Sequence, residues 1–461
     1  MTSAHTSLRE LVAHLARAQR AFDAGSLDEA EGAIADALAI DPHNVFENAD
    51  AAVIKKADEV TGGRYITAPT IAELLRAAGR KTAVAGTKSV AFLHDRHAEW
   101  TDASIKTSIK FAAAPMPPAL REETLRLLGP FLTEPTNTSD ERNRYATRAL
   151  TEVMWRDELP AFSLLWLSDP DMAEHATAPG SEACIAAVRS SDRHLALVLE
   201  TLEKRKWRES TDVFVVSDHG FSTVERAIDF TAELRKAGFD ATSSFRETPK
   251  RGQIIPAGNA GTILFYVIEH DRDVTARLVE WLQHSDFAGV IFARDQFEGT
   301  FPLEFARANT PDAPDVMVSL RWNKKANEFG FPGQIIADNA RPAGKGTHAT
   351  LSEFDIHNTL IAAGPDFREG TALSLPSSNL DLAPTILRLL GIEPPQKLDG
   401  RVLIEAMEEK AERTEVLSKT MRATRKFPSG EWQQYLKVSL VGETIYIDEG
   451  NGAFAPSERK P

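Results

Sequence analysis

The chain has 461 residues, 42% of them hydrophobic and 26% charged, which suits one large α/β domain with an insertion and the composition of a globular enzyme. Its 53 lysine and arginine residues against 67 acidic residues give a formal net charge of -14. This charge argues against a general binder of nucleic acids or anionic membranes, because the chain has no surplus of lysine and arginine side chains to displace the counterions of such partners. The single cysteine, Cys184, excludes an intramolecular disulfide and a zinc site built from cysteines.

The first 25 residues contain no apolar run of the kind that a signal peptide needs. No part of the sequence reaches the roughly 18 consecutive apolar residues of a membrane span. We therefore expect a cytoplasmic protein without a membrane partner.

Residues 8–42 have the pattern of two helices, in which Gly25 ends the first, Ser26 caps the second and Pro42 stops it. This segment resembles one tetratricopeptide repeat, whose spacing is matched by Gly25, Ala30, Ile34, Ala37 and Pro42. An ordinary amphipathic helix pair gives the same pattern of small residues. A single repeat cannot bury its apolar face alone, so the segment is a candidate surface for a protein partner.

From about residue 61 the sequence alternates between helices and short apolar strands. A helix is predicted over 68–79 and a strand over 81–86, and further strands are predicted at 161–168 and 211–218. A long helix over 181–205 joins the last two strands. This order predicts an α/β fold with a mostly parallel sheet between helices, in which ligands gather at the carboxyl ends of the strands.

The rest of the chain has a different pattern. Strand-like and helical pieces alternate over 225–340, which we interpret as an α+β cap or insertion. The last segment, 406–461, is predicted to form a charged helix and then a hairpin whose turn is Glu-Gly-Asn-Gly. The predicted organisation is therefore an N-terminal hairpin, a divided core, an insertion and a C-terminal segment, with the boundaries 1–42, 43–224 and 341–405, 225–340, and 406–461.

Three separate clusters carry groups that can bind metals. Asp171 and His175 stand four residues apart after one strand, Asp218 and His219 follow another, and His348 lies in a glycine-flanked loop. Each has a simpler explanation, since Asp171 could cap a helix, Asp218 and His219 could form a local hydrogen bond, and His348 could be a surface residue. Together the five side chains indicate two adjacent metal sites suited to zinc, or alternatively to manganese or iron.

The order of these motifs resembles the alkaline phosphatase superfamily: D-x-x-x-H, then S-D-H-G, then G-T-H, ending in LDLAPTILRLLGI. The flanking phrases TGGRYITAPTIAELLRAAGRKTAV, DIHNTLIAAGPDFR and LDGRVLIEA resemble its type I phosphodiesterase/nucleotide pyrophosphatase group, which includes phosphonoacetate hydrolase. The resemblance runs from about His43 to about residue 405, which is about four-fifths of the chain.

This resemblance implies an alkaline-phosphatase-like fold and two divalent metal ions, expected to be zinc. Asp171, His175 and His348 would hold one ion, and Asp218 and His219 the other. It also implies that a threonine or serine attacks phosphorus in a small phosphorylated substrate, and that water hydrolyses the resulting covalent intermediate.

The N-terminus departs from the family pattern. The family opens with an apolar strand that ends in a metal-binding aspartate, followed by the nucleophile and a loop of the form H-G-I-x-x-N. Residues 43–48 resemble that loop, with Asn44 in place of glycine, but the helical pattern of 8–42 stands where the strand and nucleophile should be. A replacement of that segment and a truncation of a longer chain would both explain this. Ser26 is a candidate nucleophile 17 residues before His43, although helix capping explains it equally well.

Without the usual aspartate and nucleophile, the second metal site is expected to be weakened. The first interpretation is therefore a zinc-dependent hydrolase of phosphodiesters, nucleotide pyrophosphates or phosphonates. The alternative is a catalytically impaired metal-binding relic that acts as an interaction protein through residues 8–42. A phosphoglycerate-mutase-like or sulfatase relative on the same fold is a third interpretation, but the sulfatase motif is absent and the phrases around His348 favour the phosphodiesterase group.

Overall fold

The computed structural model describes residues 68–94, 105–106, 117–132, 137–245, 248–308, 310, 312–407 and 415–457. The predicted hairpin at 8–42, the loop at 43–48 and Ser26 lie outside these residues. The chain divides into two compact units. The first unit comprises Met1–Met172, Ala186–Thr211 and Ala383–Leu398, and the second comprises Ala173–Ile185, Asp212–Leu382 and Asp399–Pro461.

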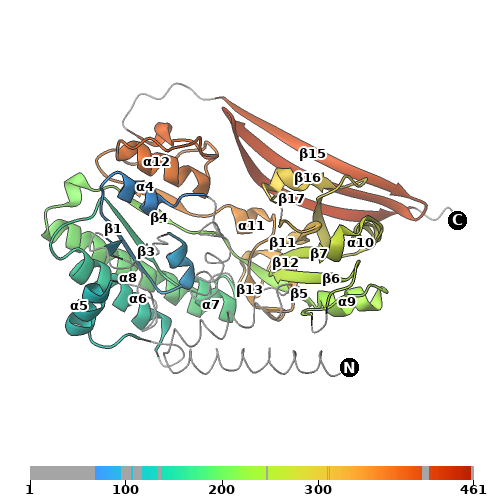
Figure 1. Ribbon diagram of the computed structural model, residues 1–461, viewed down its shortest axis with the longest axis horizontal. Helices are drawn as coiled ribbons and strands as arrows, with labels where there is room; N and C mark the ends of the chain where they lie inside the picture. Colours follow the sequence, from blue (N-terminus) through green and yellow to red (C-terminus); the bar gives the residue numbers. More distant parts are fainter. Residues whose placement is uncertain are drawn as a thin grey trace. The chain divides into compact units, whose positions relative to one another are not determined.

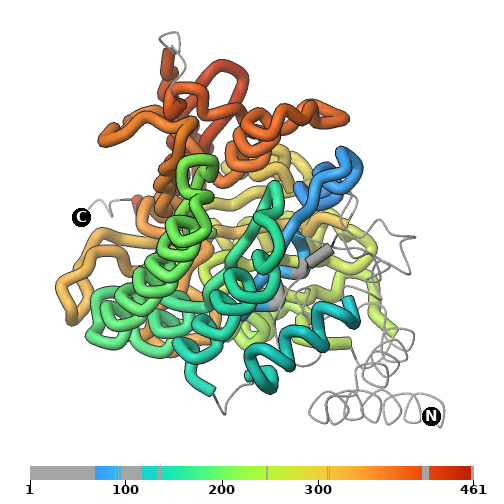
Figure 2. Tube along the Cα trace, turned by 90° about the vertical axis from the view of Figure 1, so that its left-hand side faces the viewer, coloured from blue at the N-terminus to red at the C-terminus, as the bar shows by residue number. Residues whose placement is uncertain are grey.

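The first unit contains a small parallel sheet and several helices. Its elements are α4 (Ile71–Ala77), β1 (Thr82–Gly86), η1 (Ser89–His94), β2 (Ile105–Lys106), α5 (Pro118–Leu128), α6 (Ser139–Arg148), η2 (Ala149–Met154), β3 (Phe162–Trp166), most of α8 (Glu182–Lys204), η3 (Arg208–Ser210) and most of α12 (Leu382–Leu389). β1 lies between β2 and β3 and pairs with both in parallel. Helices α5, α6 and α8 lie next to β1 and β3 (Figures 1 and 2).

Local sequence explains where these elements form. Thr70 and Glu73 make a reciprocal capping box at the start of α4, with Thr70 Oγ1 accepting from Glu73 N at 3.2 Å and Glu73 Oε2 accepting from Thr70 N at 2.6 Å. All five residues of β1 are buried, as expected for an apolar strand in the interior of a parallel sheet. The helix predicted over 68–79 and the strand predicted over 81–86 are therefore confirmed.

Helix α8 is an amphipathic helix of 23 residues. Its buried positions include Cys184, Ala187, Ser190 and His194, which recur every three or four residues. Among the helices that the structure describes, none combines the length and apolar character that crossing a membrane requires.

The described residues of the second unit form four sheets. Its elements are β4 (Val213–Val216), β5 (Ser222–Ile228), α9 (Phe230–Lys236), β6 (Ile254–Asn259), β7 (Thr262–Val267), η4 (Ile268–His270), α10 (Arg272–His284), β8 (Ala288–Ala293), β9 (Phe301–Pro302), η5 (Leu303–Ala306), β10 (Val316–Leu320), β11 (Trp322–Ala326), β12 (Pro332–Asp338), β13 (Gly346–Thr347), α11 (Glu353–Ile356), β14 (Leu360–Ala363), η6 (Asn379–Asp381), η7 (Ile404–Ala406), β15 (Val416–Phe427), β16 (Gly430–Val441) and β17 (Thr444–Pro456). Helix α7 (Asp171–Ala176) begins with Asp171 and Met172, which belong to the first unit, and its remaining residues belong to the second.

The sheets of this unit are mixed in direction. The strand orders are β6-β7-β10-β8-β9, β11-β12-β5-β13, β14-β4 and β15-β16-β17. Strand β4 pairs antiparallel with β14, and β5 pairs in parallel with β12. The alternation of helices and strands confirms the predicted α/β class with an α+β region between 225 and 340, while the four predicted domain boundaries stay predictions.

A large hydrophobic core lies between the five-stranded sheet, α9 and α10. The alternating residues Ile263, Phe265 and Val267 of β7 point into it, as the period of two of a strand requires. Trp432 of β16 is fully buried in the same core, and its Nε1 donates to Gly299 O at 3.0 Å. The C-terminal sheet is thus packed against the five-stranded sheet, and Figure 1 shows it beside α10 and β7.

The helix predicted at the start of 406–461 is wrong over residues 416–427, which form strand β15. All twelve residues of β15 pair antiparallel with β16. Met421 and Ala423 pack against a second core cluster that includes Leu436 and Val438. Strand pairing and this burial override the helix propensity of a charged segment.

The predicted turn at Glu-Gly-Asn-Gly is also wrong, since Glu449 to Gly452 lie inside β17. The turn between β16 and β17 falls at Gly442, whose φ is +61°. A Cβ on Gly452 would lie 2.1 Å from Gly289 O of the neighbouring strand β8. Gly452 therefore permits the close approach of two sheets instead of a chain reversal.

Candidate metal centre

Asp171 is the first residue of helix α7, and His175 lies one turn later on the same short helix. On a helix, their spacing of four residues places the two side chains on the same side. Lys88 Nζ lies 2.9 Å from Asp171 Oδ2, which places a positive charge against the carboxylate. Asp171 is partly buried, so this charge is only partly screened by water.

A buried polar group supports the loop that leads into α7. Asn143 Oδ1 accepts hydrogen bonds from Thr87 Oγ1 at 2.9 Å and from the backbone N–H of Ser168 at 3.1 Å. Thr87 and Ser168 are also joined through their hydroxyls at 2.7 Å. These contacts lie at the carboxyl ends of β1 and β3 and fix the backbone three residues before Asp171.

His219 lies in the tight loop between β4 and β5. The backbone N–H of Gly220 donates to Asp355 O at 2.7 Å, and a Cβ on Gly220 would lie 2.1 Å from Phe354 O. Glycine is therefore required at this position by the close approach of α11. The neighbouring Asp218 has a side chain that is 45% exposed, and its Oδ2 lies 3.5 Å from His219 Nε2.

His348 follows β13, which pairs antiparallel with β5. Its carbonyl oxygen accepts from Gly261 N at 2.9 Å, and the next residue, Ala349, has a φ of +74°. The imidazole stacks on that of His219, with 3.6 Å between the ring centroids and an interplanar angle of 19°. Two segments far apart in sequence thus present parallel imidazoles.

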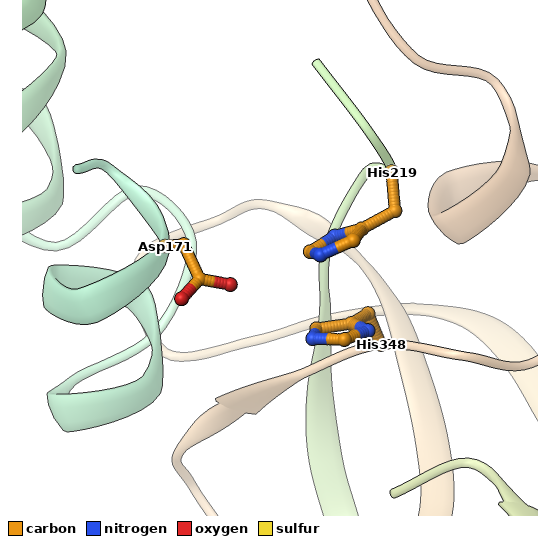
Figure 3. A group of neighbouring side chains, drawn as sticks. All are labelled: Asp171, His219 and His348. Atoms are coloured by element: carbon orange, nitrogen blue, oxygen red, sulfur yellow. The ribbon is translucent and has the colours of Figure 1, made fainter. Parts of the chain in front are cut away.

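Asp171, His219 and His348 each offer one ligand atom, and these atoms lie within 4.8 Å of one another. Figure 3 shows the carboxylate of Asp171 facing the two stacked rings. The donor set of one carboxylate oxygen and two imidazole nitrogens fits zinc, or alternatively manganese or iron. Three protein ligands are the usual number for a catalytic zinc that keeps an open position.

His175 lies beside this group. Its Nδ1 is 3.0 Å from Gly346 O, and its ring centroid is 5.2 Å from that of His348. The ring of Phe221 borders all three imidazoles, with centroid distances of 4.9 Å to His175, 5.5 Å to His219 and 5.1 Å to His348. The structure therefore gathers the predicted residues into one neighbourhood, with His219 joining Asp171 and His348; the assignment of ligands to two separate metals stays a prediction.

Asp355 was not predicted as a site residue. It is 1% exposed, and its carboxylate accepts from Ser222 Oγ at 2.5 Å, from Thr350 Oγ1 at 2.6 Å and from Thr350 N at 2.9 Å. Burial raises the pKa of Asp355 to about 6, against the opposing effect of these hydrogen bonds. Its sequence context, a short helix after a loop, has no metal-ligand spacing that would have singled it out.

The family model for type I phosphodiesterase/nucleotide pyrophosphatase matches residues 41–328, which is more than half of the chain. The chain belongs to this family. Ser26 lies outside the matched residues as well as outside the described ones, so its role as a nucleophile stays a prediction.

Individual relatives are distant. The chain is 24% identical over 262 residues to ectonucleotide pyrophosphatase/phosphodiesterase family member 3 of Rattus norvegicus, which covers 54% of this chain and 27% of that protein. It is 31% identical over 230 residues to a venom phosphodiesterase of Macrovipera lebetinus, which covers 48% and 24%. The chain thus spans about a quarter of the length of the curated relatives it matches.

Solved structures of murine ectonucleotide pyrophosphatase/phosphodiesterase 5 are also similar. One is an inactive variant in complex with AMP, with 13% sequence identity, a TM-score of 0.46, and coverage of 73% of this chain and 74% of that chain. The human form has 16% identity and a TM-score of 0.45.

Proposed function

We propose that this chain is a divalent-metal-dependent hydrolase of phosphodiesters, nucleotide pyrophosphates or phosphonates. The observation that carries the proposal is the convergence of Asp171, His219 and His348 within 4.8 Å in a member of a phosphodiesterase family. The names of its relatives support a small phosphorylated substrate, with nucleotides as the first class to test. Zinc is the first metal to test because two imidazoles and a carboxylate suit it well.

A bound divalent cation would supply positive charge for the phosphoryl oxygens and lower the pKa of a coordinated hydroxyl or water. The protein residues would orient this chemistry. The stacking of His219 and His348 and the contact of Phe221 with both rings restrict how the imidazoles turn. The contact of His175 Nδ1 with Gly346 O orients the His175 ring beside this group.

Lys88 gives a second reason to expect an anionic substrate. Its ammonium group lies 2.9 Å from Asp171 Oδ2. A cation held by Asp171 would repel the Lys88 ammonium, which could then bind an anionic group of the substrate. We expect Lys88→Met to raise KM for an anionic phosphodiester more than it lowers kcat.

The proposal is tested by replacing ligands one at a time. We expect His219→Ala and His348→Ala each to lose bound zinc and at least about 100-fold of the hydrolysis of bis(p-nitrophenyl) phosphate. His284→Ala is the matched control, since His284 is exposed and contacts Phe427 and Phe454. Full activity in His348→Ala would contradict the proposal, and zinc binding by the wild type without turnover would favour the impaired relic instead.

A further inference from the structure

His219 and His348 reach the metal centre from two segments separated by more than a hundred residues. A short imidazole stack at 3.6 Å therefore requires that the two segments be fixed to one another. Part of this comes from the pairing of β13 with β5, where Thr347 lies opposite Ser222. That pairing spans only two residues on β13, so further support is needed to define the loops on either side.

Asp355 supplies contacts to both loops at once. Toward the His219 loop, its carboxylate accepts from Ser222 Oγ at 2.5 Å and its backbone carbonyl accepts from Gly220 N at 2.7 Å. Toward the His348 loop, the carboxylate accepts from Thr350 N at 2.9 Å and from Thr350 Oγ1 at 2.6 Å. Each anchored residue lies one to three positions from a histidine.

The contacts use both oxygens of the side chain. Ser222 is bound to Oδ1, and both groups of Thr350 are bound to Oδ2. Ser222 and Thr350 are themselves buried, at 0% and 3% exposure, so water cannot replace a lost partner without a rearrangement. Buried hydrogen bonds of this kind hold loops more rigidly than exposed ones.

We propose that Asp355 is a positioning residue that sets the spacing of His219 and His348 by binding both of their loops. Its consequence for metal binding rests on the proposed function. Outer contacts that orient metal-binding histidines commonly change metal affinity by about 10–100-fold.

The test reads the two histidines directly in metal-free protein. The ring signals of ¹³C-labelled histidine are recorded by NMR and assigned with His219→Gln and His348→Gln. We expect Asp355→Ala to move the signals of both His219 and His348. Asp355→Asn should restore most of the wild-type positions, because its amide can accept from Thr350 through oxygen and donate to Ser222 Oγ through nitrogen.

Asp315→Ala is the matched control. Asp315 is another buried carboxylate, at 3% exposure, and it accepts from Val267 N at 2.7 Å and contacts His270 Nδ1 at 2.7 Å. We expect this variant to move the signal of His270 and to leave those of His219 and His348 in place. A folded Asp355→Ala protein with both signals unmoved would overturn the inference.

Two single-contact variants keep the test decisive if Asp355→Ala does not fold. Ser222→Ala removes the contact to the His219 side, and Thr350→Val removes a hydroxyl contact to the His348 side. We expect Ser222→Ala to move the His219 signal more and Thr350→Val to move the His348 signal more. Unchanged signals in both variants would equally reject the positioning role.

Zinc titration separates this inference from the proposed function. We expect Asp355→Ala to bind zinc about 10–100-fold more weakly than wild type, and Asp315→Ala to bind it as tightly as wild type. If the wild type binds no zinc, the proposed function fails while the histidine signals still decide the inference. If zinc binds and Asp355→Ala binds it equally well, the inference fails while the proposed function stands.

Discussion

Asp355 is a carboxyl group that is removed from water and held by three hydrogen-bond donors. Burial disfavours its charged form, and the pKa of about 6 shows that the donors only partly offset this effect. The carboxyl group of Asp355 therefore ionises at a higher pH in the folded protein than in the unfolded chain, where its pKa has the ordinary value of 3.8.

The stability of the metal-free protein should depend on this titration. Because the folded state holds the proton more tightly, the contribution of Asp355 is fully present below pH 3.8 and is lost as pH rises through about 6. The difference corresponds to about 3 kcal/mol of unfolding free energy at most. We expect urea unfolding to show wild type losing stability relative to Asp355→Asn between pH 4 and pH 7, and a difference that is independent of pH would contradict this.

The candidate metal ligands could be predicted from sequence because each lies after a strand end or in a glycine-flanked loop with a recognisable spacing. Asp171, His219 and His348 meet in the structure as such positions suggest. Asp355 could not be predicted in the same way. Its partner Ser222 stands 133 positions away, and only the packing of α11 against β5 brings them together.

At the scale of elements, α11 determines the shape of the His219 loop through backbone contacts. Phe354 O would lie 2.1 Å from a Cβ on Gly220, and the backbone at that point cannot give way as a flexible side chain could. We expect Gly220→Ala to lower the unfolding free energy by roughly 1–3 kcal/mol and to weaken zinc binding.

Gly370→Ala is the control for this prediction. Gly370 has a φ of +60° and open space around its Cα, so alanine there meets backbone strain but no clash. We expect a loss of about 1 kcal/mol with unchanged zinc affinity. Equal zinc affinity in both variants would refute the link between α11 and the metal centre.

A buried side chain of β16, Gln434, bonds strand β8 of the five-stranded sheet. Gln434 is 2% exposed, and it accepts from Ile291 N at 2.7 Å and donates to Ile291 O at 3.1 Å. We expect Gln434→Leu to lower the unfolding free energy by about 2–4 kcal/mol, because two backbone groups of β8 lose their partner.

The neighbouring residue, Gln433, provides the control for Gln434→Leu. Gln433 is exposed, and its side-chain Nε2 donates to Glu431 Oε2 at 2.8 Å. Gln433→Leu should change the unfolding free energy by less than about 0.5 kcal/mol, as measured by chemical denaturation. Similar losses in the two variants would mean that Gln434 has no special role in attaching the sheet.

The C-terminal strands also mark the limit of prediction from local sequence. The charged residues of this segment, such as Lys419, Arg422 and Arg425, favoured the prediction of a helix. The segment forms strand β15 instead, because its conformation depends on twelve pairings with β16. The glycines of β17 indicated a turn, but Gly452 serves the contact with β8. In contrast, β1 and α8 were predictable because their burial follows directly from their own residues.

At the scale of the whole molecule, a net charge of -14 repels an anionic substrate. Binding such a substrate therefore requires a site where positive charge is concentrated. The group of Asp171, His219 and His348, with Lys88 beside the carboxylate, provides such a place. The alternation of helices and strands was enough to predict the α/β class. The antiparallel pairing of β4 with β14 was not predictable, because register depends on partners that local pattern does not specify.

The most direct test of the account is the metal content of the purified chain, measured together with hydrolysis of bis(p-nitrophenyl) phosphate before and after chelation. We predict at least one divalent ion per chain, loss of turnover with the chelator, and recovery when zinc is added back. Turnover that persists in metal-free protein would contradict the account, and so would a chain that binds no divalent ion at all.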